Sequence, residues 1–294
     1  MKQKFLNLPS PHERQSGNGQ TRRLAYMEFG DPDNPNVLLC VHGVSRLSRD
    51  FDTLAEALAD NYRVICPDMA GRGDSDWLDN AEDYSYPVYL TDVAALLAHI
   101  GAAKVHWIGT SMGGLIGMML AAQRDSPIQR MVINDIGPVI PAASMTRIGA
   151  YLGTKQIFSD IAAGEAYLRD VHASFGPLTD EEWAHLAKHG MKLASEDAAD
   201  EQAGFRLHYD PKIAEPFKAG ASEDIVLWKI WDRILCPVLV LHGADSDLLS
   251  ADTAAEMATR GPKAKIHTLS GIGHAPALMA VEQVELLRHW LLVN

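Results

Sequence analysis

The stretch Gly109-Thr110-Ser111-Met112-Gly113-Gly114 decides how this chain is expected to fold. It follows the apolar run 105–108 and precedes the apolar run 115–120, so a buried strand is expected to turn sharply into a helix with Ser111 at the apex. Side chains two residues before and after the apex would collide with the turn, and the glycines there remove them. Such a turn raises the serine hydroxyl at the edge of a sheet. The motif therefore predicts a catalytic serine rather than an ordinary glycine-rich turn.

Uninterrupted apolar runs recur along the rest of the chain, and helical segments separate them. Strands of this kind belong to a parallel sheet that helices cover on both faces. Polar residues follow each run, at the strand ends where the chemistry of such sheets collects. The sequence therefore predicts an α/β fold with a mostly parallel central sheet flanked by helices. The expected strands are 37–41, 64–66, 105–108, 131–133, 238–241 and 266–269, and the expected helices include 51–60, 88–100, 112–123, 251–260 and 276–292.

The pattern changes between Pro138 and about Arg233, where no strong strand is expected and helical periodicity dominates. We therefore expect residues 1–137 and 234–294 to form one α/β core. Residues 138–233 are expected to form a helical insertion, a cap over the carboxyl edge of the sheet.

Composition limits the classes of function. The chain has 26 basic and 38 acidic residues, and this charge of −12 argues against nucleic acid and anionic membranes as partners. Three cysteines without a CxxC pair, and no apolar run near the ~18 residues of a membrane span, favour a cytoplasmic protein. No glycine-rich nucleotide motif is present, so no cofactor is expected. His185 and His189 stand four residues apart, but without a third ligand at a convincing spacing a solvated helix face is expected instead of a metal site.

A serine hydroxyl is a weak nucleophile and needs a base, which a third group orients. His274 is the expected base because it stands in a tight loop of small residues after the last predicted strand. Three aspartates compete for the third role: Asp245 and Asp247 follow the strand 238–241, and Asp135 follows the strand after the serine. Of these we favour Asp247.

These motifs resemble those of the α/β-hydrolase superfamily over nearly the whole chain. His42-Gly43 is similar to its oxyanion-loop motif, the loop 67–75 resembles its D-x-x-G-x-G-x-S loop, and 109–114 resembles its nucleophile elbow. The resemblance implies that the backbone N–H groups of Val44 and Met112 form an oxyanion hole.

The resemblance also bears on the acid. The usual superfamily motif is Gly-x-x-Asp, but Ser246 stands at the third position after Gly243, so the acid is displaced by one residue. The Ser-Asp pair at 246–247 resembles members whose acid belongs to such a pair, which supports Asp247. The expected order is then Ser111, Asp247, His274.

The stretches 49–51 and 134–138 resemble those of bacterial α/β-hydrolases, which include carboxylesterases, enol-lactone hydrolases and polyester hydrolases. This resemblance implies hydrolysis of a small-molecule carboxylic ester or lactone through an acyl-enzyme. One alternative is a carbon–carbon bond hydrolase, although such members carry a Trp soon after the histidine and this chain has Ala-Pro-Ala-Leu at 275–278. The other is a ligand receptor on the same fold. Ser111 excludes the aspartate-nucleophile chemistry of dehalogenases and epoxide hydrolases.

The insertion is expected to supply one apolar wall of the substrate pocket. Arg46 and Arg49 stand in the loop after the oxyanion motif, and we expect them to form ion pairs within that loop. The alternative is that one of them contacts an acidic group of the substrate. The expected wall residues are Met145, Ile148, Tyr151, Leu152, Ile157 and Phe158.

Overall fold

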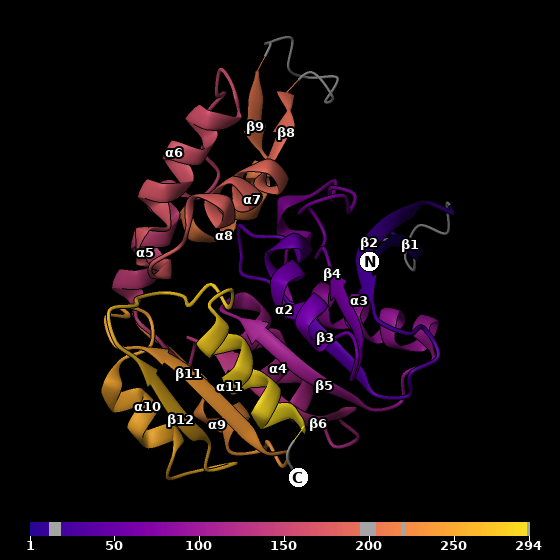
Figure 1. Ribbon diagram of the computed structural model, residues 1–294, viewed down its shortest axis with the longest axis vertical. Helices are drawn as coiled ribbons and strands as arrows, with labels where there is room; N and C mark the ends of the chain where they lie inside the picture. Colours follow the sequence, from indigo (N-terminus) through magenta and orange to yellow (C-terminus); the bar gives the residue numbers. More distant parts are fainter. Residues whose placement is uncertain (12–18, 195–203, 219–221, 293–294) are drawn as a thin grey trace.

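An eight-stranded sheet forms the centre of the computed structural model, which describes residues 1–11, 19–194, 204–218 and 222–292 (Figure 1). The first two strands in space form an antiparallel hairpin that pairs antiparallel with the third, and every later pair is parallel. The predicted, mostly parallel α/β sheet is confirmed. The spatial order is β1 (Lys2–Pro9), β2 (Thr21–Phe29), β4 (Arg63–Pro67), β3 (Val37–Val41), β5 (Val105–Thr110), β6 (Ile128–Asn134), β11 (Val238–Gly243) and β12 (Lys265–Leu269).

Helices cover both faces of the sheet, and the strands alternate between them. In β3, Leu38 and Cys40 belong to the buried cluster that includes residues of α2 and α11, while Leu39 and Val41 belong to the cluster on the opposite face. Because successive side chains of a strand point to opposite faces, a sheet covered twice needs apolar residues at every position. The first face carries η1 (Ser48–Phe51), α2 (Asp52–Leu58) and α11 (Val281–Leu292); the second carries α3 (Tyr86–Ile100), α4 (Met112–Ala121), α9 (Trp228–Trp231) and α10 (Ala251–Met257), with η2 (Ala81–Asp83) before α3.

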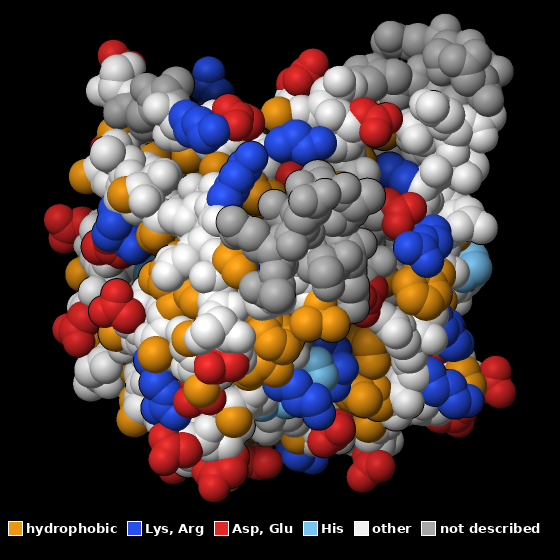
Figure 2. Space-filling model, turned by 90° about the horizontal axis from the view of Figure 1, so that it is seen from above, with side chains coloured by type: hydrophobic (Ala, Val, Ile, Leu, Met, Phe, Trp, Pro, Cys, Tyr) orange, Lys and Arg blue, Asp and Glu red, His pale blue; other side chains and the backbone are white. Residues whose placement is uncertain are grey.

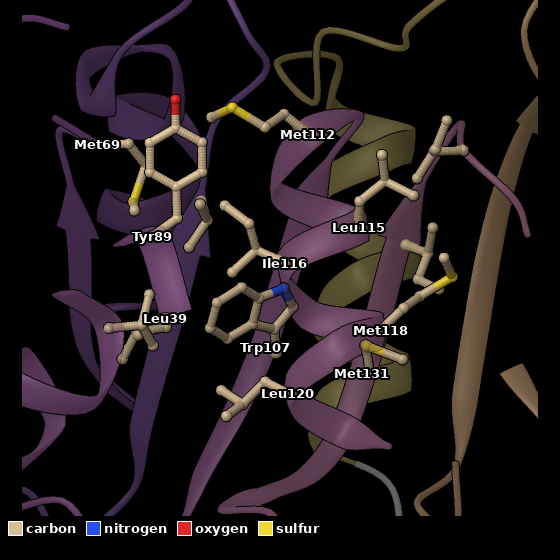
Figure 3. Close-up of a cluster of buried hydrophobic side chains, with 14 of the residues drawn as sticks. Leu39, Met69, Tyr89, Trp107, Met112, Leu115, Ile116, Met118, Leu120 and Met131 are labelled. Atoms are coloured by element: carbon tan, nitrogen blue, oxygen red, sulfur yellow. The ribbon is translucent and has the colours of Figure 1, made fainter. Parts of the chain in front are cut away.

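Trp107 of β5 holds α4 against the sheet. Its side chain is fully buried, lies beside Ile116 and Leu120 of α4, and its Nε1–H donates to the carbonyl of Gly113 at 3.2 Å (Figure 3). This contact fixes the first turn of α4 directly behind Ser111.

The segment between β6 and β11 lies beyond the carboxyl ends of the strands (Figure 1). It contains two small two-stranded sheets, β7 with β10 and β8 with β9, and several short helices. Its elements are β7 (Val139–Ile140), α5 (Ala142–Tyr151), α6 (Ile161–Val171), η3 (Ala173–Phe175), α7 (Asp180–Gly190), β8 (Met191–Leu193), β9 (Phe205–Leu207), η5 (Pro211–Ala214), α8 (Glu215–Lys218) and β10 (Ile225–Val226), followed by α9.

Backbone hydrogen bonds tie this insertion to the loop after β4. The N–H of Asp210 donates to the carbonyl of Gly71 at 2.7 Å, and the N–H of Gly73 donates to the carbonyl of His208 at 2.9 Å. The hydroxyl of Tyr84 also donates to the buried carboxylate of Asp210 at 2.6 Å. The insertion is thus held over the strand ends at a defined position.

The view onto the insertion end shows acidic and basic side chains interspersed across that face (Figure 2). Among the described residues, no helix is both long and apolar enough to cross a bilayer. All three cysteines are free thiols, and two of them, Cys40 and Cys66, are buried in the sheet.

Candidate active site

Ser111 stands at a strained turn between β5 and α4. Its φ of 50° and ψ of −112° lie outside the favoured regions, which costs on the order of 1–3 kcal/mol. Two hydrogen bonds keep the Ser111 backbone in this strained conformation: the Ser111 N–H donates to Asn134 O at 3.0 Å, and the Leu115 N–H donates to Ser111 O at 3.1 Å. A Cβ at Gly109 would lie 2.3 Å from Gly113 O, so only glycine allows the turn to close this tightly.

The strand register brings four loops to the same edge of the sheet. In the parallel ladder Val41 pairs with Gly109, Thr110 pairs with Asn134, and Asn134 pairs with Leu241. The loops that follow β3, β5, β6 and β11 therefore begin side by side. Residues that are far apart in the sequence meet around Ser111 for this reason.

His274 lies in the loop after β12, with its Nε2 2.9 Å from Ser111 Oγ. Two side chains hold this loop: Asn134 Nδ2–H donates to Pro276 O at 2.8 Å, and Ser174 Oγ–H donates to His274 O at 2.6 Å. Since Ser174 belongs to η3, the insertion takes part in fixing the histidine. The structure thus brings together the serine and histidine that the sequence motifs single out.

Asp135 lies on the other side of the imidazole, with its Oδ2 2.8 Å from His274 Nδ1. It directly follows β6 and is fully buried. Two more donors reach its carboxylate: the Gly243 N–H at 2.7 Å and the Ser246 hydroxyl at 2.6 Å. An acceptor at Nδ1 holds the tautomer that leaves Nε2 free to accept the serine proton.

The expectation that Asp247 contacts His274 is wrong. In the turn after β11, Ser246 points inward to Asp135, and the next side chain points outward. Asp247 is about half exposed (49%) and forms an ion pair with Arg147, whose Nη2 lies 3.0 Å from Oδ1. Asp245 is exposed as well. The position of Asp135, directly after the strand that neighbours β5, was the signal in the sequence that favours it.

The two residues expected to form the oxyanion hole, Val44 and Met112, lie beside Ser111. Met112 is the first residue of α4, so its N–H has no acceptor within the helix. Val44 follows Gly43 in the loop after β3, and a Cβ on Gly43 would lie 3.8 Å from Ser111 Cβ. Val44, Ser111 and Met112 all line one cavity. This is the arrangement that can bind an oxyanion.

Residues 38–286 match the alpha/beta hydrolase family. This chain belongs to that family. A 3-hydroxybutyrate-oligomer hydrolase of Cupriavidus necator is 45% identical over 268 residues, which cover 89% of this chain and 90% of that protein. Among solved structures, one from Rickettsia typhi has a TM-score of 0.89 and 31% identity over 99% of both chains. An alpha/beta hydrolase from Novosphingobium aromaticivorans has a TM-score of 0.82 and 36% identity over 98% of both.

In this alpha/beta hydrolase, a buried histidine braces the loop that carries Val44. The Met69 N–H donates to His42 Nε2 at 3.0 Å, so Nδ1 carries the proton that it donates to Gly43 O at 2.7 Å. Burial lowers the pKa of His42 to about 3, and the ring is therefore neutral at ordinary pH. The buried Arg72 adds a second brace, since its Nε–H donates to Val44 O at 2.9 Å. Neither role was expected from the sequence.

A cavity of about 420 Å³ opens beside Ser111, between the core and the insertion. Most of its lining is apolar, which suits the acyl chain of an ester. Of the expected wall residues, Met145 and Ile148 of α5 line this cavity. Tyr151 lines a separate, smaller crevice that also reaches Ser111. The wall also contains residues that were not expected, including Leu115, Met119, Ile136, Ile213, Phe217 and Leu227.

The other expected wall residues do not line the cavity or the crevice. Leu152 would continue the face of Met145, but α5 ends at Tyr151 and Leu152 has extended backbone angles. Phe158 instead exchanges backbone hydrogen bonds of 2.7 and 2.8 Å with Phe205. Ile157, the residue before Phe158, also lines neither space.

The two histidines of α7 meet a third group that was missed in the sequence. Asp52 lies with His185 and His189 so that one ligand atom of each falls within 4.8 Å of the others. The guanidinium of Arg49 already bridges this group, because its Nε donates to Asp52 Oδ2 at 2.7 Å and its Nη1 lies 3.3 Å from His189 Nδ1. Burial and the Arg49 charge lower the pKa of His189 to about 4. The cluster thus joins the insertion to η1 and α2.

Proposed function

We propose that this chain is a serine hydrolase that cleaves carboxylic esters through an acyl-enzyme. Ser111 is the nucleophile, His274 the general base and then the general acid, and Asp135 the group that orients the imidazole. One observation carries the proposal: Ser111 Oγ, His274 and Asp135 form a continuous hydrogen-bonded chain of 2.9 and 2.8 Å at the carboxyl edge of the sheet. That arrangement is the one that activates a serine hydroxyl.

The chemistry follows from these contacts. Ser111 Oγ attacks the ester carbonyl while its proton passes to His274 Nε2, and Asp135 stabilises the imidazolium through Nδ1. The N–H groups of Val44 and Met112 donate to the oxyanion of the tetrahedral intermediate, and each is worth roughly 3 kcal/mol in such sites. His274 then gives its proton to the leaving alcohol. Water, activated by the same imidazole, releases the acid and restores Ser111.

The substrate class rests on the cavity and on one relative. The apolar walls around the 420 Å³ cavity suit a short acyl chain, and Met145 and Ile148 of the insertion set its depth. The relative of 45% identity is a 3-hydroxybutyrate-oligomer hydrolase. We therefore propose short esters of 3-hydroxy acids as the first substrates to examine, with the insertion acting as the cap that selects acyl length.

The test is turnover of p-nitrophenyl esters of graded acyl length and of 3-hydroxybutyrate dimers and trimers. A fluorophosphonate probe is expected to add one label to the wild type and none to Ser111→Ala. Labelling at another serine would overturn the assignment of the nucleophile. A single-turnover release without continued hydrolysis would instead identify a ligand receptor, and cleavage of carbon–carbon substrates only would identify that class of hydrolase.

A further inference from the structure

A second, narrower crevice also reaches the proposed catalytic serine and adjoins the apolar cavity there. Both spaces are lined by Val44 and Ser111, but only the crevice is also lined by His274. In the proposed reaction His274 must hand its proton to the leaving alcohol oxygen. The leaving group therefore lies on the side of the crevice, and the acyl chain lies in the apolar cavity.

His172 is the unusual side chain of this crevice. It caps the carboxyl end of α6, and only 8% of the residue is exposed. Its ring stacks on Phe175 with centroids 4.5 Å apart and meets Tyr151 edge-on at 6.5 Å. Within the described part of the chain, neither ring nitrogen has a hydrogen-bond partner, and neither is among the fully buried unpaired atoms, so the ring nitrogens retain some access from the crevice. The geometry holds an imidazole N–H ready for a ligand.

The charged side chains that line this crevice are all basic. Arg46 and Arg147 line the crevice with His172, and no acidic residue does so in the described ranges. Each guanidinium uses Nε and Nη2 for a carboxylate that lies outside the crevice lining, Asp50 for Arg46 and Asp247 for Arg147. Burial, and then the Arg46 charge, lower the pKa of His172 well below its ordinary value, so the ring is neutral and donates one hydrogen bond. The crevice lining therefore offers an imidazole donor beside two guanidinium groups and no acidic side chain, which suits an anionic group.

We propose that the crevice binds a carboxylate on the leaving group, with His172 as hydrogen-bond donor and Arg46 and Arg147 as the favourable charges. The substrate is then an ester whose alcohol is itself a hydroxy acid. Ser111 Oγ takes the acyl group, the bond from acyl carbon to alcohol oxygen breaks, and His274 protonates that oxygen to release the free hydroxy acid. Water then releases the acyl group as a second acid.

A carboxylate site beside the leaving group gives this cleavage a direction. The volume of the crevice is about 40 Å³, which suits a compact group such as a carboxylate. Because only the last unit of a hydroxy-acid oligomer carries a free carboxylate, such an oligomer is cut one unit from its carboxyl end. This inference rests on the proposed ester hydrolysis and assigns the site of its leaving group.

The experiment compares two substrates with the same single ester bond, 3-(butanoyloxy)butanoic acid and its primary amide 3-(butanoyloxy)butanamide, which has nearly the shape of the acid but no charge. For the wild type we expect kcat/KM to favour the acid at least about tenfold, mainly through KM, as for one charge-assisted hydrogen bond. In His172→Phe, which keeps the stacking ring but not the N–H, this ratio is expected to fall towards one. His289→Phe, on the exposed side of α11, is the matched control and is expected to keep the wild-type ratio.

The outcomes separate this inference from the proposed function. If the wild type hydrolyses the butanoyl ester of the amide and p-nitrophenyl butyrate but does not prefer the acid, the carboxylate site is wrong and the ester hydrolase stands. If it hydrolyses none of the esters, the proposed function itself fails. A wild-type preference that survives in His172→Phe would overturn the role of His172. Should that variant not fold, Arg147→Gln is measured in its place, and an unchanged ratio there would likewise count against the site.

Discussion

Asp135 Oδ2 lies 2.8 Å from His274 Nδ1, although 139 residues separate the two in the chain. The contact arises because β6 pairs with β5 on one side and with β11 on the other, so the residue after β6 lies between the serine turn and the histidine loop. The hydroxyl of Ser246 reaches the same Asp135 oxygen from the turn after β11. The turn in which the acid was expected therefore supports the acid instead of supplying it.

Asp135→Asn is expected to lower kcat for p-nitrophenyl butyrate by about 10⁴-fold, because an amide in that place favours the wrong tautomer of His274. KM is expected to change little, since the carboxylate is buried behind the imidazole. Asp245→Asn is the matched control, an exposed aspartate on a neighbouring loop, and is expected to keep the wild-type kcat. A large loss in Asp247→Asn with none in Asp135→Asn would reverse the assignment.

Gly109→Ala is expected to destabilise the fold by at least about 2 kcal/mol, seen as a fall in Tm of roughly 4–8 °C. The new Cβ would stand 2.3 Å from Gly113 O, a backbone atom that cannot move without opening the turn at Ser111. Gly190→Ala provides the comparison, because a Cβ there meets its nearest side-chain atom at 3.6 Å. Equal Tm values for the two variants would show that the turn tolerates a side chain.

The sequence predicted the parts of the site that depend on local geometry. Ser111 is marked by glycines on both sides of a strand-to-helix turn, and His274 by a loop of small residues, so both were found from short windows. The acid was not, because Asp135, Asp245 and Asp247 all follow apolar strands that end at the same edge. Which of them faces the imidazole depends on which way each turn points its side chains, and that is decided by tertiary contacts such as the one from Ser246.

The residues that line the pocket could likewise be predicted only in part, because tertiary contacts decide which of them reach it. Met145 and Ile148, two of the six expected wall residues, stand three residues apart on α5 and both line the cavity. Helical periodicity could not show that the helix ends at Tyr151, which turns Leu152 away, or that Phe158 pairs with Phe205 from a distant part of the insertion. His172 was not predicted as a binding residue for a related reason: a single histidine at a helix end indicates no binding site until its spatial neighbours are known.

The pH dependence of stability follows from His42. Its pKa in the folded state, about 3, lies below the unfolded value of about 6.5, so below pH 6.5 only the unfolded chain takes up this proton. Stability is therefore lost as the pH falls from 6.5 towards 3, and between pH 7.5 and 5 the loss is about 2 kcal/mol. In His42→Gln, whose amide offers both a donor and an acceptor but does not titrate, this part of the loss is expected to disappear.

Urea unfolding of the wild type and of His42→Gln at the two pH values measures this difference directly. His289→Gln removes an exposed histidine instead and is expected to follow the wild type. If His42→Gln loses as much stability as the wild type between pH 7.5 and 5, the acid sensitivity arises elsewhere in the molecule.

The last prediction concerns the wall that the insertion contributes to the acyl cavity. Met145 lines this cavity from α5, so Met145→Ala lengthens the space available to the acyl chain. The ratio of kcat/KM for p-nitrophenyl hexanoate over butyrate is expected to rise by about tenfold, the effect of one to two methylene groups in an apolar pocket.

Phe158→Ala is the control within the same insertion, since Phe158 is buried against Tyr167 and Phe205 and lines neither space at Ser111. It is expected to cost about 3 kcal/mol of stability while the hexanoate-to-butyrate ratio stays at the wild-type value. A shift of that ratio in Phe158→Ala but not in Met145→Ala would place the acyl chain elsewhere in the insertion.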